Sequence, residues 1–381
     1  MLLEFKLVFR YNMYGGIMEK IIYNVLRKLE ENGYESYIVG GYVRDKLLGI
    51  SSMDIDITTK ARPKEVLELF SDYDVKIHEY GNVSFEIDSY KFDITTFRKD
   101  IKYKDNRKPE KIIYIDSFEE DLKRRDFTIN SICLDSDDNI IDLYDGRKDL
   151  KRKLLRTIGS PYKKMEEDAL RILRAVRFAT IMKLRLDNDL KLAIIENKHL
   201  LKNLSYERKR DELNKLFCSK HKKYGVKLLS DLGLLEVLEL KDIKYVLRTN
   251  DLIGMWSMIT DINYAFTKTE KELIKKIHEV MNLDVNDVFV EYKYGSYPIS
   301  VVSDLKKLNT KKIMAKYDKL PIKDREEIKI SVDEICRVLG KAPDSFIGII
   351  FEDIELKILS GRLLNDKEVL KDYIKNNYKG E

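Results

Sequence analysis

The sequence has few of the residues that build disulfide-linked or zinc-bound scaffolds. Its 381 residues include only three cysteines and four histidines, all scattered along the chain. An odd number of widely separated cysteines fits no disulfide framework, and no pair of these residues has the spacing of zinc ligands. We therefore expect reduced thiols and a cytoplasmic location.

Long apolar runs are absent as well. No stretch approaches the roughly 20 apolar residues that cross a bilayer, so no membrane partner is expected. The first 17 residues lack the apolar core and cleavage site of a signal peptide, and the first amphipathic run begins at Met18. We interpret residues 1–17 as an N-terminal extension.

Charge is abundant but nearly balanced. Lysine and arginine total 71 against 66 acidic residues, for a net charge of +5. Such a small excess permits nucleic-acid binding without requiring it, because a balanced total can hide a strongly basic local patch. Apolar residues make up 44% of the chain, which is enough for packed cores, and the length suggests two or three domains.

Strand and helix patterns are unevenly distributed. Short strands are predicted at 37–39, 53–58, 75–78, 83–87, 92–97, 112–115 and 140–143. Helical spacing is found at 18–32, at 42–48 and after Pro63, and the charged segment 98–110 is predicted to be a mobile loop. From about Pro161 onward helical periodicity dominates. This order predicts an α+β protein, with a β-rich head followed by helices.

Asp54 and Asp56 are the strongest catalytic candidates. They lie two residues apart on a predicted strand, so both side chains point to one face, about 6–7 Å apart. Ile55 and Ile57 predict that the opposite face is buried. Adjacent carboxylates repel one another unless a cation offsets them, which favours Mg2+ over the alternative of two solvated acids. Asp93, on a later strand, is either a third carboxylate of this site or a strand-end cap.

Gly40 and Gly41 lie between a predicted strand and a predicted helix. Glycines at such a point let backbone N–H groups approach a phosphate closely, although a glycine pair is also common in simple turns. Arg44 follows on the same short helix, from which it could bind a triphosphate with two nitrogens. Asp45 is expected to be structural.

An ordered series of motifs connects these residues to a known family. The segments are GGYVRD (40–45), DID (54–56), TTFR (95–98), RRDFTIN (124–130), DLYDGRKDL (142–150), EDALRILRAVRF (167–178) and ERKRDE (207–212). Together they resemble the polymerase-beta-like nucleotidyltransferases, and most closely the class II tRNA nucleotidyltransferases (CCA-adding enzymes) and bacterial poly(A) polymerases. The resemblance covers about residues 18–215, and residues 216–381 match only as a helical body and tail.

Charged residues recur every three positions in the segment 167–178, at Asp168, Arg171, Arg174 and Arg177. On a helix they would form one drifting stripe among apolar residues, where unpaired arginines would be costly without a polyanionic ligand. The alternative is a set of ion pairs on a solvated helix. The resemblance implies that Asp168 and Arg171 read the edge of the incoming base. It implies that Arg174 and Arg177 contact the triphosphate or support that pair.

The resemblance also implies roles for the RRDFTIN segment and a division of the chain into domains. Arg125 would bind the nucleotide's phosphate or sugar, and Asp126 would accept a hydrogen bond from a ribose hydroxyl. The expected domains are a nucleotidyltransferase head with a mixed or antiparallel sheet (18–155), a helical neck (156–215) and a tRNA-binding body and tail (216–381).

The implied activity is template-independent addition of CCA to the 3′ end of tRNA from CTP and ATP, with no obligate protein partner. Poly(A) addition and partial addition of only CC or only A remain alternatives, as does a non-catalytic RNA-binding module. The full-length segment 98–110 and the modest ending NNYKGE favour complete CCA addition. The lysine-rich segments 219–223 and 306–312 are candidate phosphate contacts for the tRNA.

Overall fold

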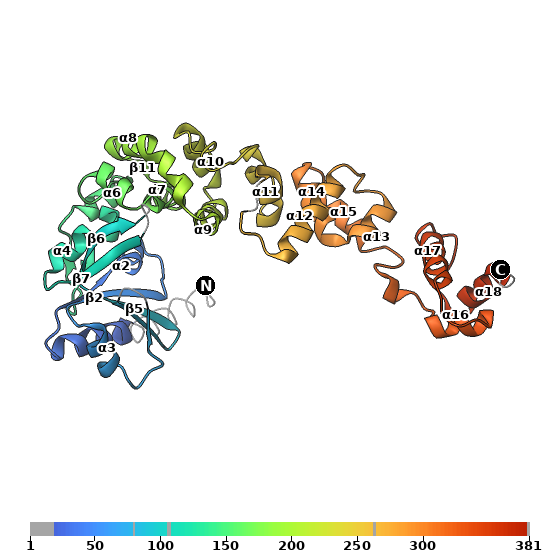
Figure 1. Cartoon of the computed structure of the whole chain (residues 1–381), viewed down its shortest axis with the longest axis horizontal. Coiled ribbons are helices and arrows are strands. Elements are labelled where there is room, and N and C mark those ends of the chain that lie inside the picture. The colour runs from blue at the N-terminus through green and yellow to red at the C-terminus, as the bar shows by residue number, and fades with distance from the viewer. Residues whose placement is uncertain (1–18, 79–80, 105–107, 262–263, 379–381) are drawn as a thin grey trace, which may run out of the picture. The chain divides into compact units, whose positions relative to one another are not determined.

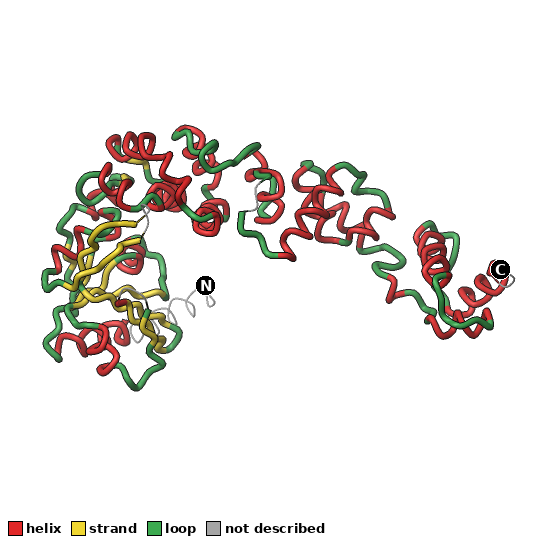
Figure 2. The backbone as a smooth tube through the Cα atoms, viewed as in Figure 1, coloured by secondary structure: helices red, strands yellow, loops and turns green. Residues whose placement is uncertain are grey.

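The computed structural model describes residues 19–78, 81–104, 108–261 and 264–378. The chain divides into two compact units, the first ending at Leu238 and the second beginning at Glu239. Strands are found in the first unit, and the described part of the second is built from helices and loops (Figure 2). The predicted α+β class is therefore confirmed. Among the described residues, no helix is both long and apolar enough to span a bilayer.

A seven-stranded mixed sheet forms the centre of the first unit, with the strand order β3-β4-β5-β2-β1-β8-β9. Its strands are β1 (Ser36–Val39), β2 (Asp54–Thr59), β3 (Lys76–Ile77), β4 (Asn82–Ile87), β5 (Tyr90–Thr96), β8 (Cys133–Leu134) and β9 (Ile140–Ile141). β2 and β5 pair in parallel, and the other neighbours in this sheet are antiparallel.

Helices pack against this sheet (Figure 1). They are the helix at residues 19–31, α2 (Gly41–Leu47) and α3 (Pro63–Leu69). Their apolar side chains form one core with those of the strands. Ile55 and Ile57 of β2 belong to this core and are 1% exposed, which confirms that the isoleucine face of the strand is buried. Asp54 and Asp56 alternate with them and therefore project from the opposite face.

The segment 98–110 was predicted to be a mobile loop, and this prediction is wrong. It belongs to an antiparallel hairpin of β6 (Arg98–Lys104) and β7 (Lys108–Tyr114), which lies beside the main sheet (Figure 1). An antiparallel ribbon satisfies its backbone groups by pairing, so it tolerates charged residues that hide the strand pattern. Residues 105–107 lie outside the described part of the chain.

Short helical elements and a helical region complete the first unit. They are α4 (Phe118–Lys123), η2 (Thr128–Asn130), α5 (Gly146–Lys151), α6 (Pro161–Glu167), α7 (Leu170–Met182), α8 (Asn188–Asn197), η3 (Lys198–Asn203), α9 (Tyr206–Phe217) and α10 (Lys222–Asp231). A small parallel pair, β10 (Leu154–Leu155) with β11 (Arg185–Leu186), joins this region. The elements α6, η3, α9 and α10 pack on α7, whose buried residues form much of the apolar interior here.

The second unit contains two apolar cores. Its elements are η4 (Ile243–Leu247), α11 (Leu252–Ile259), α12 (Lys268–Met281), α13 (Val288–Tyr294), α14 (Ser296–Leu305), α15 (Thr310–Tyr317), η5 (Arg325–Glu327), α16 (Val332–Leu339), α17 (Phe346–Leu359) and α18 (Lys367–Tyr378). One core centres on α12 and α14, and the other on α16, α17 and α18.

Candidate active site

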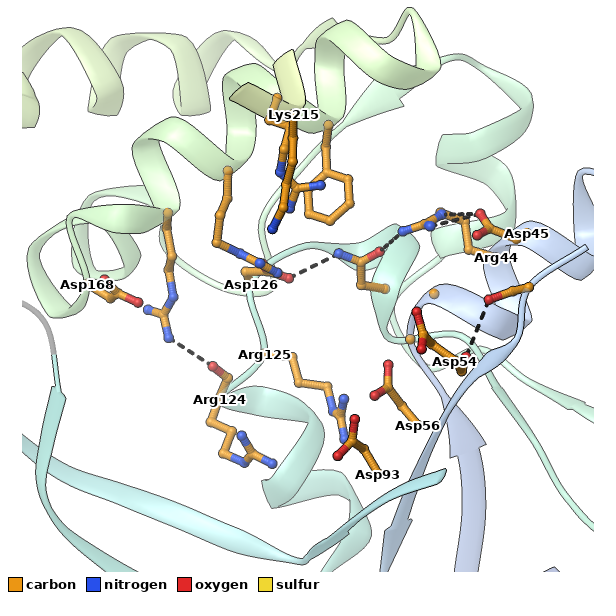
Figure 3. Close-up of a pocket in the computed structure, with 18 of the residues that line it drawn as sticks. Arg44, Asp45, Asp54, Asp56, Asp93, Arg124, Arg125, Asp126, Asp168 and Lys215 are labelled. Carbon is orange, nitrogen blue, oxygen red and sulfur yellow. Dashed lines mark hydrogen bonds and ion pairs between the residues drawn. The ribbon is translucent and has the colours of Figure 1, made fainter. Parts of the chain in front are cut away.

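A cavity of about 870 Å³ opens in the first unit (Figure 3). All ten residues predicted to form the site line it: Gly41, Arg44, Asp54, Asp56, Arg125, Asp126, Asp168, Arg171, Arg174 and Arg177. Residues that the sequence analysis did not assign to the site also line it: Ser52, Lys91, Asp100, Arg124, Asn130, Phe178 and Lys215. The structure thus gathers the predicted residues from four segments of the chain, while their individual roles stay predictions.

Carboxylates from two neighbouring strands meet at one side of the cavity. Asp56 of β2 lies directly opposite Asp93 of β5 in the parallel pairing, and Asp54 lies two residues before Asp56 on the same face. Burial is the main reason that the pKa of Asp56 is raised, and the nearby charges of Asp93 and Asp54 add to the effect. Arg125 opposes it and extends toward these carboxylates (Figure 3).

Gly40 and Gly41 lie directly against the carboxylate of Asp56. Gly40 has φ +81°, and a Cβ atom placed there would lie 2.7 Å from Asp56 Oδ2. Gly41 donates a backbone hydrogen bond to the same carboxylate, which favours its charged form. Any side chain at position 40 would therefore collide with Asp56 and strain the backbone. The two glycines were predicted to approach a phosphate, and they also hold a carboxylate in place.

The carboxylates fit a cation that needs few protein ligands. Within the described part of the chain, no group of three or more His, Cys, Asp or Glu side chains converges closely enough to enclose a metal ion. Asp54 and Asp56 nevertheless present carboxylate oxygens on one face of β2, and both line the cavity. Mg2+ commonly binds through one or two carboxylates and takes its other ligands from phosphates and water. The donor set therefore suits Mg2+ arriving with a nucleotide.

A buried aspartate that the sequence analysis missed positions the two arginines of the RRDFTIN segment. Asp121 is fully buried. It accepts from Arg124 Nε at 2.8 Å, from Arg125 Nη2 at 3.2 Å and from Thr58 Oγ1 at 2.9 Å. Burial would raise the pKa of Asp121, but Arg125 and Arg124 outweigh it and lower this pKa. The signal in the sequence was the helical spacing of three and four residues between this acid and the arginines.

Arg125 keeps a donor for a ligand. Its Nε is buried and has no hydrogen-bond partner among the described residues, while its Nη2 is held by Asp121. A buried N–H without an acceptor costs free energy, so an anionic ligand in the cavity would be stabilised by accepting from it.

The arginines of α7 are paired, which corrects the argument made from the sequence. Arg171 bonds Glu167 at 2.7 Å. Arg174 bonds Asp126 at 2.6 Å, and Arg177 bonds Glu212 at 2.5 Å. A polyanionic ligand is therefore not needed to compensate these buried charges. The partners of Arg174 and Arg177 come from distant segments, so spacing within the helix could not identify them.

Asp168 does not lie on the same helix as the arginines, and this too corrects the predicted stripe. α6 ends at Glu167, Asp168 has extended dihedral angles, and α7 begins at Leu170. Asp168 Oδ1 accepts from the backbone N–H of Leu170 at 2.9 Å. Such local bonds from aspartate compete with helical pairing and explain the break. Burial raises the pKa of Asp168, against the influence of Arg171.

Arg171 is buried and fixes this break in position. Its Nη1 donates to the carbonyl oxygen of Lys164 at 3.0 Å, and its Nη2 donates to that of Arg124 at 3.1 Å. The break between α6 and α7 is thereby tied to the end of α4 (Figure 3). To donate to a base edge, Arg171 would have to share or exchange one of these acceptors.

Phe178 is an aromatic lining residue that the sequence analysis did not single out. The guanidinium carbons of Arg44, Arg174 and Arg177 lie 5.4, 5.2 and 4.0 Å from the centre of its ring. Arg44 also bonds Asp45 at 2.8 Å and donates to Asn130 Oδ1 at 2.8 Å. One ring thus gathers three cations from two helices through cation–π contacts. Asp45 pairs with Arg44, in keeping with the structural role expected for it.

Comparisons with known proteins extend over nearly the whole chain. Residues 36–156 match a model of the poly A polymerase head domain. Residues 183–244 match a model described as an RNA- and SrmB-binding site of polymerase A, and residues 239–374 match tRNA nucleotidyltransferase domain 2.

Curated relatives are similar over the same extent. The CCA-adding enzyme of Ligilactobacillus salivarius (strain UCC118) is 34% identical over 377 residues, which cover 91% of this chain and 93% of the relative. The chain belongs to the CCA-adding enzyme family. The CCA-adding enzyme of Lactococcus lactis subsp. lactis (strain IL1403) is likewise 34% identical, over 376 residues that cover 91% of this chain and 94% of the relative. The resemblance inferred from the motifs is thereby confirmed.

Solved CCA-adding enzymes share the fold. The Bacillus stearothermophilus CCA-adding enzyme in complex with CTP superposes with a TM-score of 0.79, at 24% identity over 93% of this chain and 96% of that one. The Thermotoga maritima CCA-adding enzyme complexed with tRNA gives a TM-score of 0.69, at 20% identity over 94% and 95% of the two chains.

Proposed function

We propose that this CCA-adding enzyme is a tRNA nucleotidyltransferase that adds C, C and A in turn to the 3′ end of tRNA, taking them from CTP and ATP. One observation carries the proposal: all ten predicted residues line one cavity, in a chain 34% identical to a CCA-adding enzyme over 91% of its length. Each step joins the RNA 3′-hydroxyl oxygen to the α-phosphorus of the nucleotide and releases pyrophosphate.

Asp54 and Asp56 are proposed to hold the divalent cation, and Mg2+ is the ion that suits them. When bound, it would lower the pKa of the attacking hydroxyl and stabilise the charge on the departing pyrophosphate. Gly41 and Arg125 favour the charged form of Asp56, through a backbone hydrogen bond and a nearby positive charge, against the burial that raises its pKa. The protein itself thus supplies position and charge, and no side-chain nucleophile is needed.

The arginines and Asp126 of the cavity are proposed to hold the nucleotide. Donors for the triphosphate are offered by the unpartnered Nε of Arg125 and by Arg174 and Arg177, which lie over the ring of Phe178. Asp126 accepts from Arg174, Asn130 and the backbone of Phe127. A carboxylate has about four acceptor sites, so a ribose hydroxyl could still bond it.

Asp168 and Arg171 are proposed to read the base. Both line the cavity, beside the break between α6 and α7. Cytosine and adenine each offer one exocyclic amine donor and one adjacent ring-nitrogen acceptor, which match a carboxylate and a guanidinium. Uracil and guanine present the reverse order, and their rejection would follow from leaving buried polar groups unpaired.

We further propose a cytoplasmic location, because Cys133, Cys218 and Cys336 are all free. Free thiols are usual in compartments that keep cysteine reduced.

The test of the proposed activity uses three tRNA transcripts, ending before the first C, after CC and after CCA. Each is incubated with the full-length protein, Mg2+ and either CTP or ATP. Complete CCA addition predicts CC from CTP on the first, one A from ATP on the second and no addition to the third. Long adenylate tails would indicate a poly(A) polymerase. Activity on only one of the first two transcripts would indicate partial addition, and binding without any addition would indicate a non-catalytic module.

A further inference from the structure

A strongly basic surface lies on the first unit outside the cavity. Over seven residues of sequence, α5 and the residues that follow it expose five cationic side chains: Arg147, Lys148, Lys151, Arg152 and Lys153. In the part of the chain that the structure describes, none of the five forms an ion pair. We call these five side chains the basic ridge. Like charges this close repel one another, so the ridge is suited to a polyanion that would offset them.

The basic ridge is rigidly attached to the wall of the cavity. On the buried side of α5, Asp149 Oδ2 accepts from Thr128 Oγ1 at 2.7 Å. A Cβ atom at Gly146 would lie 2.3 Å from the carbonyl oxygen of Thr128, so α5 packs directly against η2. η2 ends in Asn130, which lines the cavity. A ligand held on the ridge is therefore held at a fixed position relative to the nucleotide site.

An apolar groove lies beside the basic ridge. Its volume is about 270 Å³, and it is lined by Leu47, Leu48, Arg147, Leu150 and Lys151. Leu48 is 44% exposed and follows α2, the helix whose first residue, Gly41, lies at the cavity. Charged side chains beside an exposed apolar floor match a strand of nucleic acid, which alternates phosphates with ribose and base faces.

We propose that the basic ridge binds backbone phosphates of the tRNA close to its 3′ end, with the apolar groove beneath a sugar or base. The inference rests on the proposed function, because it needs an RNA whose 3′-hydroxyl lies at Asp54 and Asp56. The ridge and the cavity share α2, η2 and α5 as supports, so the RNA contacted by the ridge is the part next to the reacting end.

The test compares two double variants. One removes two charges from the ridge, and the other removes two charges elsewhere in the first unit. The test variant is Lys148→Gln with Lys151→Gln. The control is Lys20→Gln with Lys64→Gln, two exposed lysines on the helix at residues 19–31 and on α3. Binding of an RNA hairpin that carries only the acceptor stem and 3′ end is measured from 50 to 200 mM salt, together with the KM for CTP.

Each lost phosphate contact lowers the slope of log affinity against log salt by about one. The ratio of the RNA affinity of the wild type to that of the test variant should therefore shrink roughly tenfold between 50 and 200 mM salt. The KM for CTP should be unchanged. The control should follow the wild type. If the slope of log RNA affinity against log salt were equal in all three proteins, the inference would be overturned. That would hold even if a different acidic macromolecule bound the ridge. Absence of nucleotide addition by the wild type would instead overturn the proposed function.

Discussion

Arg174 donates from Nε to Asp126 Oδ2 at 2.8 Å, and its Nη2 forms an ion pair with the same oxygen at 2.6 Å. This pair joins α7 to the segment that follows α4. Burial would raise the pKa of Asp126, but Arg174 and the bonds from Asn130 and Phe127 outweigh it and lower the pKa from 3.8 to about 2. The carboxylate therefore stays charged at any pH at which the enzyme would work.

The stability of the head should depend on this carboxylate in acid. The folded pKa is below the unfolded one, so the contribution is fully present above pH 4 and is lost as pH falls toward 2. It amounts to about 2 kcal/mol. The difference in free energy of unfolding between the wild type and Asp126→Asn should therefore shrink from pH 5 to pH 3 in urea titrations. Asp137→Asn, which alters an exposed carboxylate, should show a constant difference, and a constant difference for Asp126→Asn would contradict the prediction.

Removing either proposed cation ligand should abolish nucleotide addition. Asp54→Ala and Asp56→Ala should each lower kcat by several orders of magnitude, because metal-ion catalysis contributes several kcal/mol. Binding of tRNA should persist, as measured by filter retention. Asp72→Ala, which removes an exposed acid from the same unit, serves as the control. Wild-type turnover by the Asp56→Ala variant would contradict the metal assignment.

Changing the proposed base reader should change which nucleotide is used. Asp168→Ala should relax discrimination against UTP and GTP by roughly ten- to a hundredfold, because its carboxylate would no longer select an amine donor. The measurement is kcat/KM for all four nucleotides. If Asp168 only caps α7 through Leu170, the variant should lose stability with its CTP-to-UTP selectivity intact.

The hairpin of β6 and β7 should govern the change from C to A. It brings Asp100 to the cavity wall, so it is placed to influence the base-reading residues. Replacing residues 101–111 by a short turn should leave CC addition and remove the final A. A variant with the full hairpin and Lys99→Gln, at an exposed position, is the control. Normal A addition by the shortened protein would refute this role.

The affinity for tRNA should fall steeply as salt rises. Lysines of the segments 219–223 and 306–312 are expected to bind phosphates, and Lys307, Lys311 and Lys312 are exposed. Replacing these three by glutamine should reduce the slope of log affinity against log salt by about three. A slope equal to that of the wild type would exclude the segment 306–312 from the interface.

Local pattern was enough to predict the strand that carries Asp54 and Asp56, but not its surroundings. Alternation along β2 predicted a buried face at Ile55 and Ile57, and this is confirmed. The hairpin was missed because its charged residues conceal strand periodicity. The break at Asp168 was missed because the apolar spacing runs on through it, and a single side-chain bond to Leu170 interrupts the helix.

The partners of the site residues could not be predicted because they depend on tertiary packing. Glu212 meets Arg177 only after α9 docks on α7, and its position in the sequence carries no signal of the cavity. Asp121 is the exception, because its spacing of three and four residues from Arg124 and Arg125 is visible in the sequence. The family resemblance identified which residues belong together, and the structure adds the acids that hold them.

The parallel pairing of β2 with β5 bears on how the enzyme acquires activity. A tight turn cannot close a parallel pair, so the chain passes through α3, β3 and β4 before Asp93 returns beside Asp56. Contacts between segments so far apart form slowly, whereas helices form from near neighbours. During refolding, the helical circular dichroism signal should therefore recover before catalysis does. Regained activity would report completion of the central sheet, and it would distinguish the native protein from compact intermediates that already contain their helices.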